Sequence, residues 1–246
     1  MKDILKDVVK HTHDLGFIEA VKLDGNDSGT HVEAMETERQ VVLYGKLHND
    51  VPDLQGTSGA SNLGYLKWLL TWNHVNDDAS SMEVNRQERN GVEQPVELEF
   101  KGADATPWYY RFMSSELVES QLRTVKFKGV EWDVEFNPSV DNMRIFNEAA
   151  TGIMMFEPTF SISLEDGDLV INFGSGANAH RGKIIFARNI AGKLTKKWSW
   201  PIDKVIAILN LADTGNCKIS IADAGAMQIT IDSGIGSYNY ILPARA

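Results

Sequence analysis

The chain has 246 residues, of which 43% are hydrophobic and 24% charged, so it is long enough to bury a full core and carries no sign of disorder. Its only cysteine, Cys217, excludes an internal disulfide bond. No apolar run reaches the roughly 18 residues that cross a bilayer, and the N-terminal segment lacks the apolar core of a signal peptide. We therefore expect a cytoplasmic protein without membrane contact, built from one or two domains.

The net charge of −10 is unevenly distributed. The first 120 residues contain 11 basic and 21 acidic residues, whereas the remainder contains 13 of each. A simple nucleic-acid-binding protein is usually basic overall. The charge totals therefore argue against such a protein unless its positive side chains are gathered on one surface.

Helical periodicity occurs in four segments, which start at similar intervals along the chain. The predicted helices span residues 2–14, 61–73, 138–150 and 200–211. Predicted start signals are Ser61, Asn137 followed by Pro138, and Ser199 or Trp200 before Pro201. Each helix has an apolar stripe that we expect to be buried: Ile4, Leu5, Val8, Val9 and Thr12; Leu63, Tyr65, Leu66, Leu69 and Leu70; Val140, Met143, Phe146 and Ala150; Ile202, Val205, Ile206 and Leu209.

Only strands are predicted between these helices, because the intervening segments mostly alternate polar with apolar residues and end in turns rich in Gly or Asn. The predicted strands are 17–24, 30–37, 39–47, 81–87, 96–102, 108–113, 130–136, 159–165, 168–174, 182–188, 217–223, 227–233 and 238–243. The repeating unit is thus one helix followed by several strands, and it occurs four times. Two repeats in each half give an α+β fold with two similar domains, residues 1–120 and 121–246, joined by a connector at about 115–129.

This organisation resembles the DNA sliding clamps, the processivity factors of DNA polymerases. The segments NLGYLKWLLTW (62–72) and WPIDKVIAILNLADTG (200–215) are similar to the second inner helix of each clamp domain. The terminal segment 217–246 is similar to the closing strands of a clamp, and FGSGANAHRGKIIFARN (173–189) to the approach to its subunit-pairing edge. Two domains in a chain of this length are the pattern of the homotrimeric clamps of tailed bacteriophages.

The resemblance implies a processivity-clamp fold with two helices packed on antiparallel sheets in each domain. It implies a non-enzymatic viral protein of DNA replication that acts in the host cytoplasm, where a homotrimeric ring encircles double-stranded DNA without reading its sequence. The expected partners are a DNA polymerase and an ATP-dependent clamp loader, and no cofactor is expected. A sliding contact requires Lys and Arg side chains facing phosphates, which is compatible with an acidic exterior.

The resemblance also implies three sets of functional residues. The expected DNA-facing residues lie on the four helices and in the loop before the last one: Lys2, Lys6, Lys10, Lys67, Arg144, Lys204, Lys193, Lys196 and Lys197. The expected subunit interface pairs two strand edges, with Trp108, Tyr110 and Phe112 on one and Lys183, Ile185 and Ala187 on the other. The expected partner-binding residues are Leu117, Val118 and Leu122 of the connector and Tyr240, Ile241, Leu242 and Pro243 of the last strand.

Catalytic and metal-binding patterns are weak. His11 and His13 are two residues apart, which places them on different sides of a helix. The glycine-rich segment 174–183 lacks the G-K-[ST] of a phosphate-binding loop. We therefore predict neither a catalytic residue nor a metal site.

Two alternatives remain open at this stage. The six tryptophans raise the possibility of a β-rich binding module that stacks sugars or bases, although their scatter favours core packing. An acidic, β-rich chain without motifs is also typical of virion structural proteins. The repeated helices with outward basic residues favour the clamp, because a virion protein has no need of them.

Overall fold

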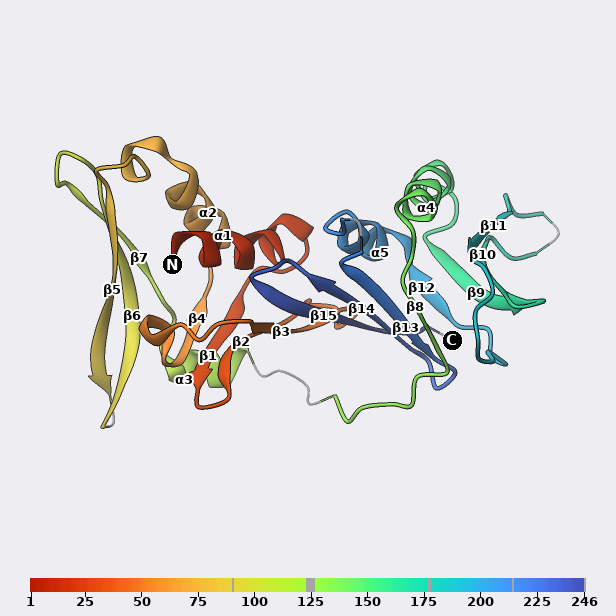
Figure 1. Ribbon diagram of the computed structural model, residues 1–246, viewed down its shortest axis with the longest axis horizontal. Coiled ribbons are helices and arrows are strands. Elements are labelled where there is room, and N and C mark those ends of the chain that lie inside the picture. The colour runs from red at the N-terminus through yellow and green to blue at the C-terminus, as the bar shows by residue number, and fades with distance from the viewer. Residues whose placement is uncertain (90, 123–126, 177, 214, 246) are drawn as a thin grey trace. The chain divides into compact units, whose positions relative to one another are not determined.

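The structure is a computed structural model that describes residues 1–89, 91–122, 127–176, 178–213 and 215–245. Its internal contacts divide the chain into two compact units, whose elements are labelled in Figure 1. The N-terminal unit comprises Met1–Val125 and Ser233–Tyr238. The C-terminal unit comprises Lys126–Asp232 and Asn239–Ala246.

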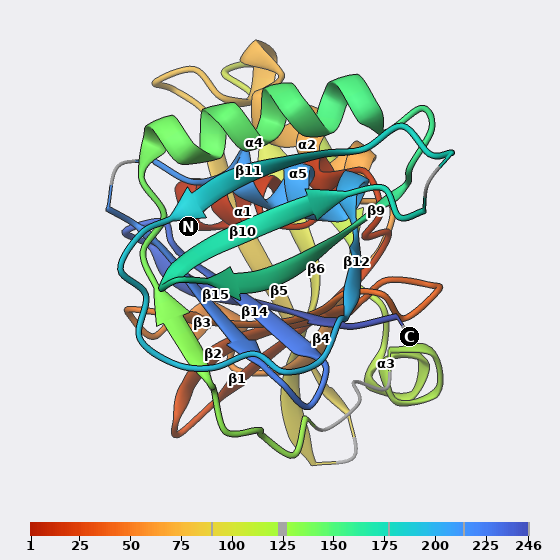
Figure 2. The same cartoon turned by 90° about the vertical axis from the view of Figure 1, so that its right-hand side faces the viewer.

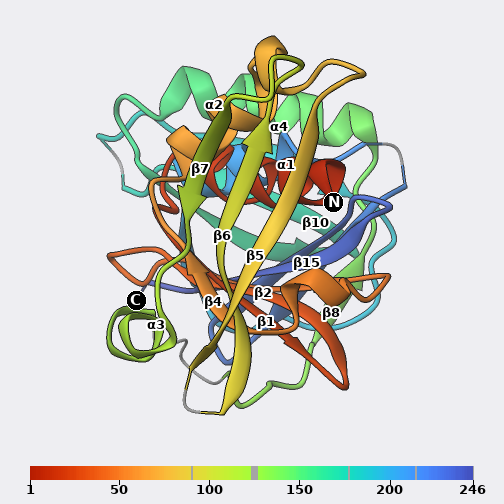
Figure 3. The same ribbon diagram turned by 90° about the vertical axis from the view of Figure 1, so that its left-hand side faces the viewer.

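The N-terminal unit has two antiparallel sheets. The first has the strand order β4-β1-β2-β3, and Ser233–Tyr238, which includes the start of β15, lies next to β3. The second has the order β5-β6-β7, and Figure 3 shows these three strands side by side. The strands are β1 (Val21–Asn26), β2 (Gly29–Met35), β3 (Val42–Leu47), β4 (Gly56–Ala60), β5 (Ser81–Arg89), β6 (Val92–Lys101) and β7 (Pro107–Arg111).

Two helices of the N-terminal unit, α1 (Lys2–Lys10) and α2 (Leu63–Thr71), contact each other. The predicted stripes are buried except at Ile4, which is half-buried, and Tyr65, which is 40% exposed. Helix α1 ends four residues earlier than predicted, and the chain continues into a short 3-10 turn at His13–Leu15. The buried Thr12 hydroxyl donates to the Val8 carbonyl at 2.6 Å, so it satisfies an acceptor at the end of the helix.

The C-terminal unit repeats this plan with two sheets and two helices. One sheet has the order β8-β13-β14, with the remainder of β15 beside β14, and the other has the order β11-β10-β9-β12. Figure 2 shows β11 alongside α4, which it contacts. The elements are β8 (Val134–Phe136), α4 (Val140–Ile153), β9 (Thr159–Glu165), β10 (Asp168–Phe173), β11 (Gly182–Ala187), β12 (Ser199–Pro201), α5 (Ile202–Leu209), β13 (Cys217–Ala222), β14 (Ala226–Asp232) and β15 (Gly236–Pro243).

Helix α1 begins at Lys2 as predicted, whereas the predicted starts of α2, α4 and α5 were each two residues early. Helix α4 is capped by Ser139, whose hydroxyl accepts a hydrogen bond from the Asn142 amide at 3.1 Å, rather than by Asn137. Val140 is therefore the first helical residue and is 49% exposed instead of buried. Helix α2 begins after Asn62, which has a left-handed backbone and makes no side-chain cap, so the predicted capping role of Ser61 was also wrong.

Three elements were not predicted from the sequence. Strand β4 has the composition Gly-Thr-Ser-Gly-Ala, and β12 forms where a helix start was expected. The third is helix α3 (Ser115–Gln121), which lies inside the predicted connector, where residues 123–126 fall outside the described part of the chain. Helix α3 packs on β4 at Gly59, where a Cβ atom would lie 2.7 Å from Val118, so the small residue permits the contact.

A buried polar cluster ties α1 to the segment Ser233–Tyr238. The Asp7 carboxylate accepts hydrogen bonds from the Ser233 and Tyr238 hydroxyls, both at 2.8 Å. The His11 ring is 1% exposed and stacks on the Tyr238 ring with centroids 4.0 Å apart. Burial lowers the pKa of His11 to about 4, although Asp7 opposes the shift, and Lys10 lowers the pKa further.

The pH dependence of stability should therefore contain a contribution from His11. Because its folded-state pKa of about 4 lies below the unfolded value of 6.5, the unfolded chain binds more protons between these values. The contribution of His11 to the free energy of unfolding should be fully present above pH 6.5. It should be lost as the pH drops towards 4, which lowers the free energy of unfolding by roughly 3 kcal/mol. In His11→Phe, which keeps a stacking ring but cannot be protonated, urea unfolding at several pH values should show a clearly flatter slope across this range. An unchanged slope would contradict this account.

Candidate functional site

Each unit presents a pair of helices, and six of the nine predicted DNA-facing residues lie on these helices. The other three, Lys193, Lys196 and Lys197, lie in the loop before β12, which is held to Asp223 after β13 by the Thr195 and Lys196 amides. In the N-terminal unit α1 contacts α2, and in the C-terminal unit α4 contacts α5. The Asn147 amide donates to the Asn210 side-chain oxygen at 2.7 Å across the second pair. The question for each cation is therefore whether its charge is already paired within the chain.

In the N-terminal unit, Lys2 and Lys67 are engaged by protein groups. The Lys2 ammonium donates to the Val75 carbonyl at 2.8 Å and to the Ser80 hydroxyl at 3.0 Å. Burial lowers the pKa of Lys2, Lys6 lowers it further, and Asp77 opposes the shift. The Lys67 ammonium lies 2.9 Å from the Asp14 carboxylate. A phosphate would have to compete with these partners.

The cations on α4 and α5 are engaged in the same way. The Arg144 guanidinium bonds Glu148 at 2.7 Å and approaches Asp141 at 3.8 Å. The hydrogen bond to Glu148 is the main cause of the raised pKa of Arg144. Lys204 lies 3.5 Å from Asp203, and its side chain is only 14% exposed.

Five of the predicted cations keep an available charge. Lys6 and Lys10 on α1 and Lys193, Lys196 and Lys197 before β12 are exposed, and none forms an ion pair within the described residues. The Lys196 ammonium lies 5.7 Å from the ring centre of Trp198, and the Asp223 carboxylate, which accepts from the Thr195 and Lys196 amides at 2.8 and 2.9 Å, adjoins the same loop. The available positive charge is thus located on α1 and in the 193–197 loop.

The first predicted interface strand, β7, lies at the edge of its sheet, where the order β5-β6-β7 shows no further described strand. Trp108 is 38% exposed, but Tyr110 and Phe112 are buried. The Tyr110 hydroxyl donates to the Ser61 carbonyl at 2.6 Å, and burial raises the pKa of Tyr110 above its usual range. These two residues fix β7 to the unit, while Trp108 remains exposed.

The second predicted interface strand, β11, is likewise an edge strand of its sheet among the described strands. Lys183 and Ile185 are exposed, and Lys183 pairs with Glu165 at 2.8 Å. A register shift opposite Leu169 and Val170 disturbs the alternation, so that both Phe186 and Ala187 are buried. The three residues were expected to share the exposed side of the strand. Lys183 and Ile185 do so, whereas Ala187 is buried.

The predicted partner-binding residues differ in exposure. Leu117 is 46% exposed, Pro243 is exposed and Leu122 is half-buried. The remaining members of the set are buried: Val118, Tyr240, Ile241 and Leu242. The Leu242 carbonyl accepts from the Trp200 indole at 3.3 Å, so this part of β15 completes the core of the C-terminal unit.

Sequence reasoning missed a cluster of aromatic side chains on the N-terminal unit. We call it the aromatic cluster, and its members are Tyr65, Trp68, Trp72, Trp108 and Tyr109. Trp68 and Trp72 stack at 4.7 Å, and Trp108 meets the Trp72 ring edge-on at 5.0 Å. The expectation that these tryptophans pack in the core was wrong for Trp68 and Trp108, which are 41% and 38% exposed. The helical spacing of residues 65, 68 and 72 was the available signal.

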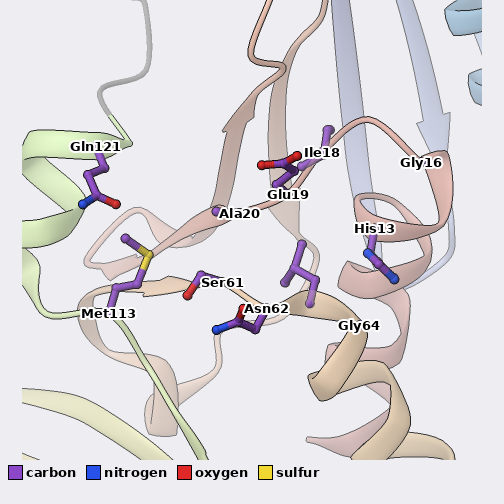
Figure 4. Close-up of a pocket in the computed structure, with 11 residues that line it drawn as sticks. His13, Gly16, Ile18, Glu19, Ala20, Ser61, Asn62, Gly64, Met113 and Gln121 are labelled. Atoms are coloured by element: carbon purple, nitrogen blue, oxygen red, sulfur yellow. The ribbon is translucent and has the colours of Figure 1, made fainter.

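A pocket of about 540 Å³ opens on the N-terminal unit, and none of its residues was predicted. Figure 4 shows the polar side chains around it, among them His13, Glu19, Asn62 and Gln121. Glu19 is exposed and forms no ion pair with any described residue. A carboxylate at this position disfavours a phosphate ligand.

The described residues contain no group of three or more His, Cys, Asp or Glu side chains arranged to hold a metal ion. Among them, no helix has both the length and the apolar character needed to cross a membrane. Cys217 is buried, and burial raises the pKa of its thiol to about 12. It is thus a core side chain with very little thiolate at neutral pH.

Comparison with solved structures reveals what this arrangement is similar to. The A. fulgidus PCNA bound to the C-terminal region of FEN-1 matches all of this chain and 96% of its own at a TM-score of 0.70 and 11% identity. The PCNA of Thermococcus kodakaraensis matches 98% of this chain and 97% of its own at 0.69 and 12%. The Proliferating Cellular Nuclear Antigen of Entamoeba histolytica matches all of this chain and 96% of its own at 0.68 and 12%.

The chain has the PCNA clamp fold. The predicted α+β clamp fold is confirmed, because the match extends over the whole chain and both units contain antiparallel strand pairs, such as β1 with β2 and β9 with β10. No protein-family model and no curated protein sequence matches the chain. The chain thus shares the clamp fold with these structures at a sequence identity that is too low for the role of a residue to be assigned from the position that it matches in them.

The two neighbouring tyrosines of β7 should differ in their contribution to stability. Tyr110→Phe removes the hydroxyl that satisfies the buried Ser61 carbonyl, and we expect the free energy of unfolding to fall by about 1 kcal/mol. Tyr109→Phe is the matched control, because Tyr109 is 46% exposed and should change stability by less than about 0.5 kcal/mol. Chemical denaturation measures both values, and equal effects would show that the Tyr110 hydroxyl is not a structural donor.

Proposed function

We propose that this chain is a DNA sliding clamp, which encircles duplex DNA as a ring and tethers a replicative DNA polymerase. The observation that carries the proposal is the clamp fold over the complete chain, at TM-scores up to 0.70. We further propose that the two units are the two clamp domains, divided near residue 120 and joined by the connector at about 115–129. The alternatives, a β-rich ligand-binding protein or a virion structural protein, gain no support from this fold.

Ring formation is proposed to occur between the open edges of β7 and β11 of neighbouring copies. Each strand has no described neighbouring strand on one side, and pairing these two edges extends the sheet from one copy to the next. Two different edges on one chain produce a head-to-tail contact, which closes a ring when the rotation is cyclic. Three copies give the homotrimer that the two-domain pattern implies.

DNA contact is proposed to rest on the cations whose charge is available. Lys6 and Lys10 on α1 and the lysines of the 193–197 loop attract phosphates without reading bases. Lys2, Lys67, Arg144 and Lys204 are paired within the chain and contribute less. A weakly positive lining agrees with sliding, since tight phosphate contacts would slow movement.

The remaining assignments concern partners and place of action. We propose that Leu117, Leu122 and Pro243, the accessible members of the predicted set, contact the polymerase, while the buried members support them. The chain is proposed to act without catalytic activity of its own, so ring opening requires an ATP-dependent clamp loader. Its place of action is proposed to be the cytoplasm, that of the host if the source is viral.

The ring is tested by mass and topology. Light scattering at micromolar concentration should give a mass near three times the 27.4 kDa of one chain. After loading, the protein should remain on nicked circular DNA through a gel-filtration column and be lost when the circle is linearised. A monomer that binds circular and linear DNA equally would refute the proposal.

The DNA contact is tested by charge reversal on α1. We expect Lys6→Glu with Lys10→Glu to weaken duplex binding about tenfold and to lower the slope of log K against log salt by about 2, since each phosphate contact contributes about 0.9. The matched control is Lys46→Glu with Lys128→Glu, two exposed lysines outside the helices. Equal effects of both pairs would show that α1 does not face DNA and that binding responds only to total charge.

A further inference from the structure

Large apolar side chains that remain exposed are concentrated at two places. Of the thirteen among the described residues, four belong to the aromatic cluster: Tyr65, Trp68, Trp108 and Tyr109. Five others lie on α4, in the turn after it and on β11: Ile145, Met154, Met155, Phe156 and Ile185. Apolar surface gathered in this way marks contact sites rather than ordinary exposure.

The aromatic cluster is held in place before any contact forms. The Tyr65 hydroxyl donates to the Tyr109 carbonyl at 3.2 Å, which joins α2 to β7. The Asn76 amide donates to the Leu69 and Trp72 carbonyls at 2.7 and 2.8 Å, which secures the end of α2 below the indoles. Little side-chain entropy remains to be lost on binding, a property of strong interface anchors.

The second place is the segment directly after α4, which we call the methionine segment: Met154, Met155 and Phe156. Met155 is 85% exposed and Phe156 is 59% exposed, the two largest exposures among large apolar side chains of the described chain. The Phe156 ring lies 4.5 Å from the His180 ring, which holds the segment beside the start of β11. Methionine side chains adapt their shape and bind favourably to aromatic rings.

The two places have the same layout. The aromatic cluster combines α2 with the open edge of β7, and the methionine segment follows α4 beside the open edge of β11. The charged groups beside both places are paired within the chain: Lys183 with Glu165 and Arg188 with Asp168, both at 2.8 Å, and Asp104 with His74 at 3.5 Å. Rigid aromatic rings at one edge thus match flexible apolar chains at the other.

We infer that the aromatic cluster is the binding site for the methionine segment of a second copy of this chain. The inference rests on the proposed head-to-tail ring and assigns most of the energy of that contact to side chains instead of to strand pairing. When β7 of one copy pairs with β11 of the next, α2 of the first copy and α4 of the second come to the same subunit contact. Met155 and Phe156 then cover Trp68 and Trp108, and both apolar surfaces leave water.

A nucleic-acid ligand fits the aromatic cluster less well. Base-stacking surfaces are accompanied by cations that hold the backbone. Here Lys67 is paired with Asp14, and Asp104 places a carboxylate next to the rings. The first 120 residues also contain 21 acidic against 11 basic residues, an excess that repels phosphate.

The test uses one variant for each side of the contact. Met155→Lys with Phe156→Ser alters the methionine segment, and Trp108→Ala alters the aromatic cluster. Sedimentation should show self-association weakened at least about tenfold in each, the size of an interface anchor lost. The matched control is Val92→Lys, because Val92 is 53% exposed and lies at neither place, and it should associate as the unaltered chain does. Circular dichroism confirms that all three are folded.

Mixing the two altered chains identifies the partner surfaces. The Trp108→Ala chain keeps an intact methionine segment, and the Met155→Lys, Phe156→Ser chain keeps an intact aromatic cluster. A one-to-one mixture should therefore form a dimer and stop there, because the two remaining surfaces are both defective. Fluorescence of the tryptophan cluster should shift on mixing.

Each other outcome overturns the inference in a distinguishable way. If the unaltered chain is a trimer and both altered chains are trimers as well, the proposed ring stands and this contact does not stabilise it. Two monomeric altered chains that form no dimer on mixing would show that the surfaces do not bind each other. A monomeric parent chain would remove the proposed ring together with the inference.

Discussion

The N-terminal unit depends on the polar contact between its first helix and a segment more than 220 residues later. Asp7 accepts two hydroxyl hydrogen bonds from Ser233 and Tyr238, while His11 stacks on the Tyr238 ring. A buried carboxylate is costly unless its oxygens are satisfied, so this segment is held in one position. The chain enters the C-terminal unit from there, where Trp200 and Leu242 continue the core. The same strand therefore contributes to both cores.

Strand β7 in one unit and β11 in the other both lie at a sheet edge, and exposed apolar side chains lie beside each of them. An open edge in an isolated protein invites aggregation and is normally short, charged or covered. Here β7 carries Trp108 and β11 carries Ile185, each next to a helix with further exposed apolar groups. Such edges are acceptable when another copy covers them. The proposed ring and the proposed contact at the aromatic cluster would both cover these edges.

Charge is distributed so that few cations remain uncommitted. Intramolecular carboxylates pair with Lys67 and Arg144, and protein oxygens hold Lys2, which leaves α1 and the 193–197 loop as sources of available positive charge. An acidic protein with a small number of free lysines attracts a polyanion weakly and is repelled elsewhere. This balance agrees with the proposed function, in which duplex DNA is held by enclosure rather than by affinity.

Periodicity in the sequence determined the helices and most strands, because burial of one face leaves a signal in every few residues: Leu66, Leu69 and Leu70 predict α2, and Ile219 and Ile221 predict β13. Composition likewise determined the acidic, disulfide-free character of the chain. Strand β4 and helix α3 left no such signal, since the pairing of Gly59 with Val118 across sixty residues stabilises both. Only the tertiary structure brought Trp68, Trp72 and Trp108 together and showed which lysines are already paired. These properties depend on distances between residues that are remote in the chain, and a local pattern does not contain them.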